Sequence, residues 1–210
     1  YTPLTPLHWL ERSARTYGDA EAIRYSRSEL SQSWLQTRDR AVALADALRR
    51  EYGVGRGDVV QVMLHNTPEM VEAHFGVPMS GAVLGCINTR LDAGTVAYCL
   101  SHSEAKVLIV DVDRAPIVEE ALDLLRADGV VDLPALVRVD DVPALTTEAP
   151  PASAEGAPGG RMGAAPDYEA LVASGSSAFA WVRPTDEWDA LSLNYTSGST
   201  GRPKGCVLHH

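Results

Sequence analysis

The sequence has 210 residues, 45% of them hydrophobic and 22% charged, which is typical of a globular protein with its own core. Its formal net charge of −10 argues against nucleic acid or an anionic membrane as the main partner. The three cysteines are odd in number and lack CxxC spacing, which argues against a disulfide framework and a zinc site. No apolar run approaches the ~20 residues of a membrane-spanning helix, and no secretory signal opens the sequence.

The N-terminal segment predicts a helix followed by a short antiparallel hairpin. Thr5-Pro6 has the pattern of a helix start, with a capping hydroxyl before a proline, and Gly18 marks the expected end. The apolar residues expected to face inward are Leu7, Leu10 and Ala14. Residues 22–25 predict a strand, and residues 32–34 are its expected antiparallel partner.

Apolar residues at helical spacing predict a second helix from Gln36 to Tyr52. Asp46 and Arg50 lie four residues apart, so an ion pair is expected on its outer side. The glycines of Gly53-Val-Gly-Arg-Gly-Asp58 resemble half of a dinucleotide fingerprint, but they precede a strand instead of following one. A glycine cap and a turn are therefore the favoured interpretation.

Between residues 58 and 139, strand-like and helix-like segments alternate at short spacing. The expected strands are nearly continuous apolar runs, typical of a parallel sheet covered on both faces, and they span 58–64, 82–87, 106–111 and 135–139. The expected helices span 66–80, from Asp92 or Thr95 to His102, and 116–127. His74 is interpreted as a packed or hydrogen-bonded helix residue, and Pro78 should kink or end its helix. This order predicts an α/β fold with a largely parallel β-sheet and helices on both faces.

Residues 146–166 break this alternation. Ala, Pro and Gly supply 14 of these 21 positions, so few large apolar groups remain to be buried. We expect a low-complexity surface insertion here and not a hinge between domains. After it, the sequence predicts a short helix near 168–173 and a strand that leads into a glycine-rich loop.

The most informative stretch is that loop, Tyr195-Thr-Ser-Gly-Ser-Thr-Gly-Arg-Pro-Lys-Gly205. Hydroxyls, glycines and one lysine alternate in it, so it offers free backbone N–H groups, close approach and positive charge to an anion. A Walker A loop needs Gly-Lys-Ser/Thr, whereas here Pro203 precedes the lysine and a glycine follows it. A plain surface turn would not require the proline–lysine–glycine sequence. The loop therefore predicts a polyphosphate cradle at the end of a strand.

This stretch of eleven residues resembles the phosphate-binding signature of the adenylate-forming superfamily: acyl-CoA synthetases, luciferases and nonribosomal peptide adenylation domains. The resemblance continues upstream, for example in residues 54–60, 66–68 and 74–84, and points to the short- and medium-chain, plant-like acyl-activating branch. It is poor only in residues 26–33 and in the insertion. Family members are more than twice as long, so the resemblance implies that residues 1–210 are a partial N-terminal AMP-binding domain.

The resemblance implies that the loop holds the β- and γ-phosphates of ATP while a carboxylate attacks the α-phosphorus and pyrophosphate leaves. The residues implied to contact ATP are Thr196, Ser197, Gly198, Ser199, Thr200, Gly201 and Lys204. The hydroxyls would donate hydrogen bonds, the glycines would allow close approach, and the lysine would neutralise charge on pyrophosphate. His210 matches a histidine near the family's carboxylate pocket, His209 replaces a small residue, and Arg202 occupies a variable position.

The resemblance implies an ATP-dependent carboxylate–CoA ligase with a fatty or aromatic acid substrate, located in the cytoplasm or the peroxisome and not secreted. The resemblance places the catalytic lysine and the residues that bind Mg²⁺ and CoA beyond His210. The isolated chain is therefore not expected to catalyse, and it should carry an unpaired sheet edge with exposed apolar side chains. The alternative is a non-catalytic remnant or interaction module that keeps only the family's N-terminal fold and phosphate loop.

Overall fold

The computed structural model describes residues 2–26, 30–140, 160–196 and 202–210. At its centre lies a six-stranded sheet in the order β6-β5-β3-β4-β7-β8, in which only β7 and β8 pair antiparallel. Its strands are β3 (Val59–Met63), β4 (Val83–Cys86), β5 (Ala105–Asp111), β6 (Ala135–Val139), β7 (Ala190–Thr196) and β8 (Lys204–His209). The predicted α/β fold with a largely parallel sheet is confirmed.

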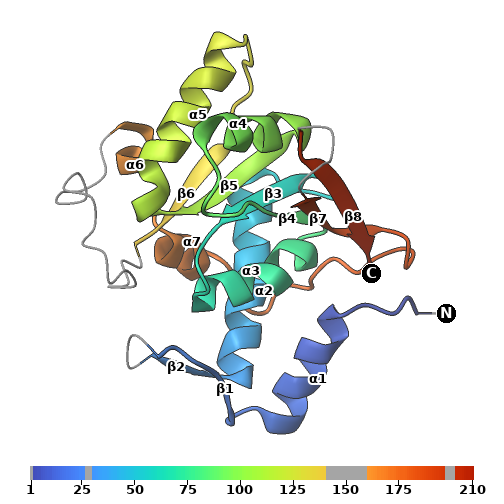
Figure 1. Cartoon of the computed structure of the whole chain (residues 1–210). Coiled ribbons are helices and arrows are strands. Elements are labelled where there is room, and N and C mark those ends of the chain that lie inside the picture. Colours follow the sequence, from blue (N-terminus) through green and yellow to red (C-terminus); the bar gives the residue numbers. More distant parts are fainter. Residues whose placement is uncertain (1, 27–29, 141–159, 197–201) are drawn as a thin grey trace.

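Helices cover both faces of this sheet (Figure 1), with α2, α3 and α7 on one face and α4, α5 and α6 on the other. They are α2 (Trp34–Tyr52), α3 (Pro68–Met79), α4 (Ala93–His102), α5 (Ala115–Ala127), α6 (Gly160–Ala164) and α7 (Tyr168–Ser174), with a 3-10 turn at Val112–Arg114. In the described ranges, no helix is both long and apolar enough to cross a membrane.

The N-terminal elements pack against the outside of α2. Helix α1 (Leu7–Tyr17) buries its three predicted inward residues, and β1 (Glu21–Arg24) pairs antiparallel with β2 (Ser31–Ser33) as predicted. Trp34 belongs to α2 and not to the strand, because Ser33 and Gln36 form a capping box that starts the helix there. Thr5 is not the N-cap of α1, although its hydroxyl accepts a hydrogen bond from Leu7 N–H at 3.3 Å.

Helix α2 ends at Gly53, whose φ of 60° gives the predicted left-handed glycine cap. Its predicted outer ion pair is wrong in part, because Asp46 is buried rather than exposed. The Asp46 carboxylate accepts a hydrogen bond from Ser176 N–H at 2.8 Å, and Arg50 approaches it at 3.5 Å. Asp46 therefore connects α2 to the segment that follows α7. Pro78 lies in the last turn of α3, as predicted.

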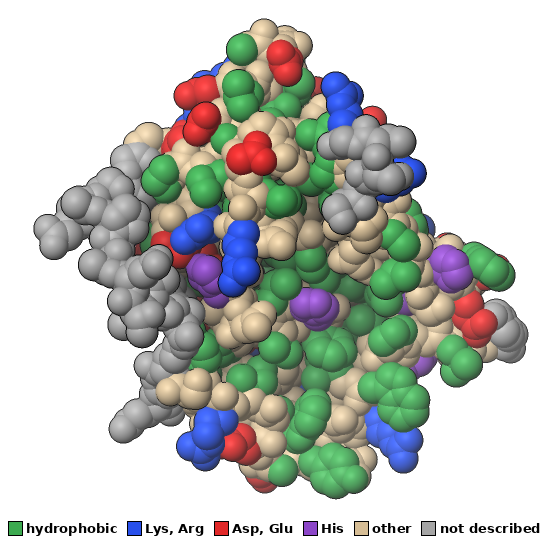
Figure 2. Space-filling model, in the orientation of Figure 1, with side chains coloured by type: hydrophobic (Ala, Val, Ile, Leu, Met, Phe, Trp, Pro, Cys, Tyr) green, Lys and Arg blue, Asp and Glu red, His purple; other side chains and the backbone are tan. Residues whose placement is uncertain are grey.

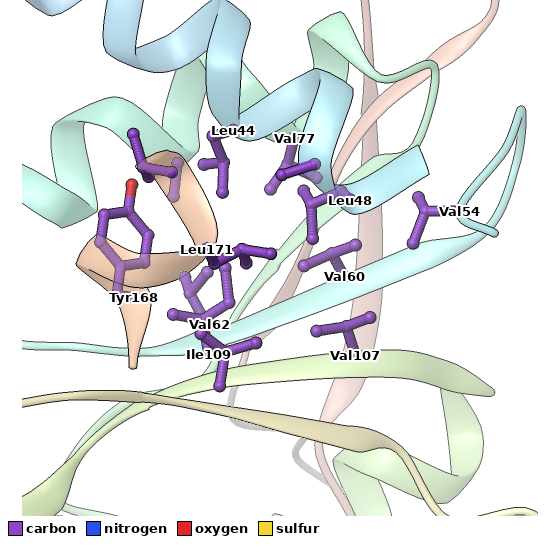
Figure 3. Packing of buried hydrophobic residues seen from close by; sticks show 14 of the residues in the cluster. Leu44, Leu48, Val54, Val60, Val62, Val77, Val107, Ile109, Tyr168 and Leu171 are labelled. Atoms are coloured by element: carbon purple, nitrogen blue, oxygen red, sulfur yellow. The ribbon is translucent and has the colours of Figure 1, made fainter. Parts of the chain in front are cut away.

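The core between the sheet and α2, α3 and α7 is made mostly of aliphatic side chains, together with the ring of Tyr168 (Figure 3). Leu44 and Leu48 of α2 point toward the sheet, where Val60 and Val62 of β3 and Ile109 of β5 meet them, and all five are fully buried. Burying one such side chain contributes about 1.5–3 kcal/mol. This packing makes the centre of the sheet a rigid support for the loops at its edge.

The last residues of the expected surface insertion are packed against the fold. Residues 160–164 form α6, and Met162 is fully buried against α5. Glu119 of α5 accepts a hydrogen bond from Met162 N–H at 2.8 Å and pairs with Arg161 at 2.7 Å. Met162 and Glu119 therefore attach to the fold a segment that its composition had predicted to be unpacked. Residues 146–159 lie outside the described residues.

Candidate functional site

The predicted phosphate loop joins β7 to β8, an antiparallel pair at one edge of the sheet (Figure 1). Thr196 is the last residue of β7 and pairs with Lys204, the first residue of β8. Since β7 runs parallel to β4, this point lies at the carboxyl edge of the parallel strands, where α/β sheets bind ligands. The predicted ATP contacts that lie outside the described residues are Ser197, Gly198, Ser199, Thr200 and Gly201.

The two described flanks of the loop have the chemistry that an anion requires. The Thr196 and Lys204 side chains are exposed, and Lys204 makes no ion pair with any residue in the described ranges. Its ammonium is therefore free to meet a phosphate as a compact point charge. The sequence prediction did not include β8, which places this lysine directly opposite Thr196.

Tyr195 turns its ring to the other side of β7, toward α4. Its hydroxyl oxygen lies 2.9 Å from Nδ1 of His102 and 3.3 Å from the backbone oxygen of Cys99. Burial raises the pKa of Tyr195 to about 12, so this phenol stays neutral and keeps its hydrogen. Nothing in the sequence assigned a role to these α4 residues. The one signal it offered was that Tyr98 and His102 lie four positions apart on a predicted helix.

Arg202 precedes β8 and also reaches α4. Its guanidinium carbon lies 5.7 Å from the ring centroid of Tyr98, within the range of a cation–π contact. The sequence left this arginine without a function because it occupies a variable position in the family signature. The structure directs its charge toward an aromatic ring of the scaffold.

His210 lies at the opposite end of the hairpin from Lys204. The six residues of β8 separate the two by roughly 20 Å. His210 N–H donates to the backbone oxygen of Asp189 at 3.2 Å, and its Nδ1 lies 2.7 Å from Oγ1 of Thr5. Burial, opposed by Asp189 and reinforced by Arg56, lowers the pKa of His210. The structure therefore does not bring His210 and the loop flanks together, and its role in substrate binding stays a prediction.

Two cavities lie away from the loop. His210 borders the smaller one, of about 130 Å³, together with Arg56 and Asp189. The larger, of about 270 Å³, lies between Tyr25, Pro68 and Tyr168 and contains none of the predicted site residues.

A second polar cluster lies at the carboxyl ends of β3 and β5. Asp111 accepts from His65 N–H at 2.6 Å, and Nε2 of His65 lies 2.9 Å from Asp113 Oδ2. These three side chains are close enough to hold a metal ion. However, Arg114 donates to the same Asp113 oxygen at 2.8 Å, and its positive charge opposes a cation there. The cluster is best described as a hydrogen-bond network that ties β3 to β5.

Burial raises the pKa of Asp111 to about 7. Its Oδ1 atom is buried and has no hydrogen-bond partner among the described residues. The carboxyl group is thus the most deeply buried member of this polar cluster, and only one of its oxygens has a partner among the described residues.

A model of the AMP-binding enzyme family matches residues 10–210 of the chain. The chain belongs to this family. The predicted membership of the adenylate-forming superfamily is confirmed.

Plant ligases are among the chain's curated relatives. The peroxisomal acetate/butyrate–CoA ligase AAE7 of Arabidopsis thaliana is 40% identical over 212 residues, covering 100% of this chain and 35% of the relative. The 2-methylpropanoate–CoA ligase CCL4 of Humulus lupulus is 39% identical over 211 residues, again with 35% of the relative covered. The chain spans about a third of the length of these relatives, so their activities are not assigned to it by similarity alone.

Solved structures give the same fold. The anthranilate CoA ligase AuaEII in complex with anthranoyl-AMP superimposes with a TM-score of 0.79 at 24% identity, covering 100% of this chain and 35% of that one. At this level of identity the comparison establishes the fold alone. The predicted N-terminal adenylate-forming architecture is therefore confirmed.

Proposed function

We propose that the complete protein carrying this domain is an ATP-dependent carboxylate–CoA ligase. It would activate a carboxylic acid, fatty or aromatic, as the acyl-adenylate with release of pyrophosphate, and then form the CoA thioester. Support comes from membership in the AMP-binding enzyme family together with a loop whose flanks, Thr196 and Lys204, face each other at the carboxyl edge of the sheet. The two plant relatives are named for small carboxylates, which favours short-chain acids.

In this proposal the loop binds the phosphates that leave. Thr196, Ser197, Ser199 and Thr200 donate hydrogen bonds, Gly198 and Gly201 let the phosphates approach the backbone, and Lys204 neutralises the departing pyrophosphate. Removing one preorganised donor of this kind costs about 10²–10³-fold in rate. Mg²⁺, bound through residues outside these 210, would supply further neutralisation of the phosphate charge.

The chain has only two lysines, which provides a matched test. Lys204→Met in the complete polypeptide should lower carboxylate-dependent ATP–pyrophosphate exchange at least about 100-fold. Lys106→Met is the control, because Lys106 lies on β5 and contacts Asp58 at 3.0 Å, away from the loop. It should stay within about threefold of the wild type, as exposed pairs contribute little. Undiminished exchange by Lys204→Met would contradict the assigned role.

We further propose that the 210 residues alone do not complete the reaction, because they span 35% of the ligases they resemble. The isolated chain should show no carboxylate-dependent exchange, and measurable exchange would contradict this. A complete polypeptide without exchange would instead favour the non-catalytic remnant. A C-terminal Ser-Lys-Leu in the complete sequence would decide between peroxisome and cytoplasm.

A further inference from the structure

Helix α4 contacts both described flanks of the phosphate loop. Tyr98 and His102 lie four residues apart, hence on one face of the helix, and their ring centroids are 5.3 Å apart. Tyr195, before the loop, meets His102 at a centroid distance of 5.7 Å and Tyr98 at 6.4 Å. Arg202, after the loop, lies over Tyr98. We call Tyr98, His102 and the backbone oxygen of Cys99 the α4 platform.

The platform itself is firmly held. Val96, Cys99 and Leu100 of α4 are buried at 2% exposure or less and pack in the core against β5 and α5. The outward side of the same helix therefore presents its aromatic groups from a fixed position. A hairpin attached to it inherits that position.

Tyr195 is attached by two hydrogen-bond contacts to the platform. If its hydroxyl donates to the Cys99 oxygen, His102 must carry its proton on Nδ1 and donate to the phenol oxygen. If instead the phenol donates to His102, the ring nitrogen accepts. Either tautomer ties the end of β7 to the last residue of α4.

Gly205 fits against the same group of rings. A Cβ atom there would lie 2.9 Å from Leu193 Cδ1 and 3.7 Å from ring atoms of both His102 and Tyr195. The start of β8 therefore lies close against α4 as well as against β7. Two contacts, at Tyr195 and Arg202, and the close approach of Gly205 therefore lie at one end of α4.

We propose that the α4 platform positions the phosphate loop, with His102 and Tyr98 as positioning residues and Tyr195 and Arg202 as the points of attachment. The reason is preorganisation: loop donors stabilise a developing charge only if they are already in place. Both flanks are attached on the same side, so the loop's two ends keep a constant separation and orientation. The proposal rests on the proposed function for its catalytic consequence, but the attachment itself does not.

Three variants of the complete protein test it: Tyr195→Phe, His102→Phe and their combination. Each single change keeps an aromatic ring and removes the hydrogen bond between the two side chains. His74→Phe is the matched control, because His74 is also an exposed helical histidine, with Nδ1 2.7 Å from the Met70 oxygen, and it lies outside the site. Arg202→Met tests the second attachment.

For the hydrogen-bond variants we expect the KM for ATP to rise about threefold to tenfold, as for the loss of one hydrogen bond. The KM for the carboxylate should stay within about twofold. The double variant should match Tyr195→Phe, because that change already removes the bond lost in His102→Phe together with the contact to the Cys99 oxygen. Arg202→Met should raise the KM for ATP about twofold to fivefold, the range for the loss of an exposed cation–π contact. His74→Phe should resemble the wild type.

Amide hydrogen exchange separates this proposal from the proposed function. In the variants, amides of β7 and β8 should exchange faster by a similar factor, while those of β3 and β5 stay unchanged. A protein that shows this pattern but no ATP–pyrophosphate exchange would refute the function and keep the attachment. The proposal would be overturned if amide hydrogen exchange in β7 and β8 were unchanged, or if it became faster throughout the domain. Fully additive effects of the two substitutions on the KM for ATP would also overturn it.

Discussion

The strand pair at the centre of the sheet and the pair at its edge are held in different ways. In β3 and β5, Val62 and Ile109 are fully buried between two layers of helices. In β8, Val207 and Leu208 remain 53% and 51% exposed, matching the apolar edge expected from the sequence. Figure 2 shows hydrophobic side chains gathered over the middle and lower part of one face of the molecule, with charged side chains both around and among them.

This difference separates folding from positioning. The centre gains its stability from area removed from water, which is large and insensitive to exact geometry. The attachment of the β7–β8 hairpin to α4 relies on a few side-chain hydrogen bonds and ring contacts, which are weak but directional. Substitutions in the centre should therefore change the free energy of unfolding, whereas those in the hairpin should change ligand binding.

The largest expected contrast comes from one chemical change made at both places. Val62→Ala removes two buried methyl groups and should lower the free energy of unfolding by about 2–3 kcal/mol. Val207→Ala, on the exposed edge, should change it by less than about 0.5 kcal/mol. Urea unfolding of the chain followed by circular dichroism measures both. Equal losses would remove the distinction between centre and edge.

A second test uses the buried carboxyl group of the centre. Burial raises the pKa of Asp111 to about 7 from 3.8, so the folded protein holds a proton that the unfolded chain releases. Between these pKa values the folded state binds more protons, so stability should fall as pH rises from about 4 to about 7. From pH 5 to pH 8 this loss amounts to about 2.5 kcal/mol.

Asp111→Asn cannot ionise, so it should lack that part of the pH dependence. Urea unfolding at pH 5 and pH 8, in wild type and variant, isolates the effect as a difference of differences. Other titrating groups cancel to first order because both proteins carry them. Parallel pH profiles would show that Asp111 ionises alike in the folded and unfolded states.

The smallest expected effect concerns Gln61, in the middle of β3. Both polar atoms of its side chain are fully buried without a hydrogen-bond partner among the described residues, and its side chain lies over Gly85 of β4. Gln61→Met keeps the length and removes the unsatisfied amide, so it should raise the unfolding free energy by about 1 kcal/mol. Thermal unfolding measures this, and a lower midpoint would point to a partner for the amide.

Much of the scaffold could be predicted because its signals are local. The apolar runs of β3 and β5, the cap at Gly53 and the helix start at Asp92 each depend on neighbouring residues, and each lies where expected. Element boundaries are harder to predict: Trp34 was expected in a strand, but the capping box at Ser33 starts the helix there. The burial of Met162 could not be predicted for another reason: it packs in the core beside α5, and its N–H donates to Glu119, 43 residues earlier in the chain.

The candidate site divides in the same way. The sequence by itself determined the family and the chemistry of the loop, because hydroxyls, glycines and a lysine in fixed order form a local, highly specific pattern. Only the tertiary structure decided that β8 returns antiparallel, that His210 ends far from Lys204, and that α4 contacts both flanks of the loop. His102 and Tyr195 are 93 positions apart, and only packing of the sheet against α4 brings such side chains together.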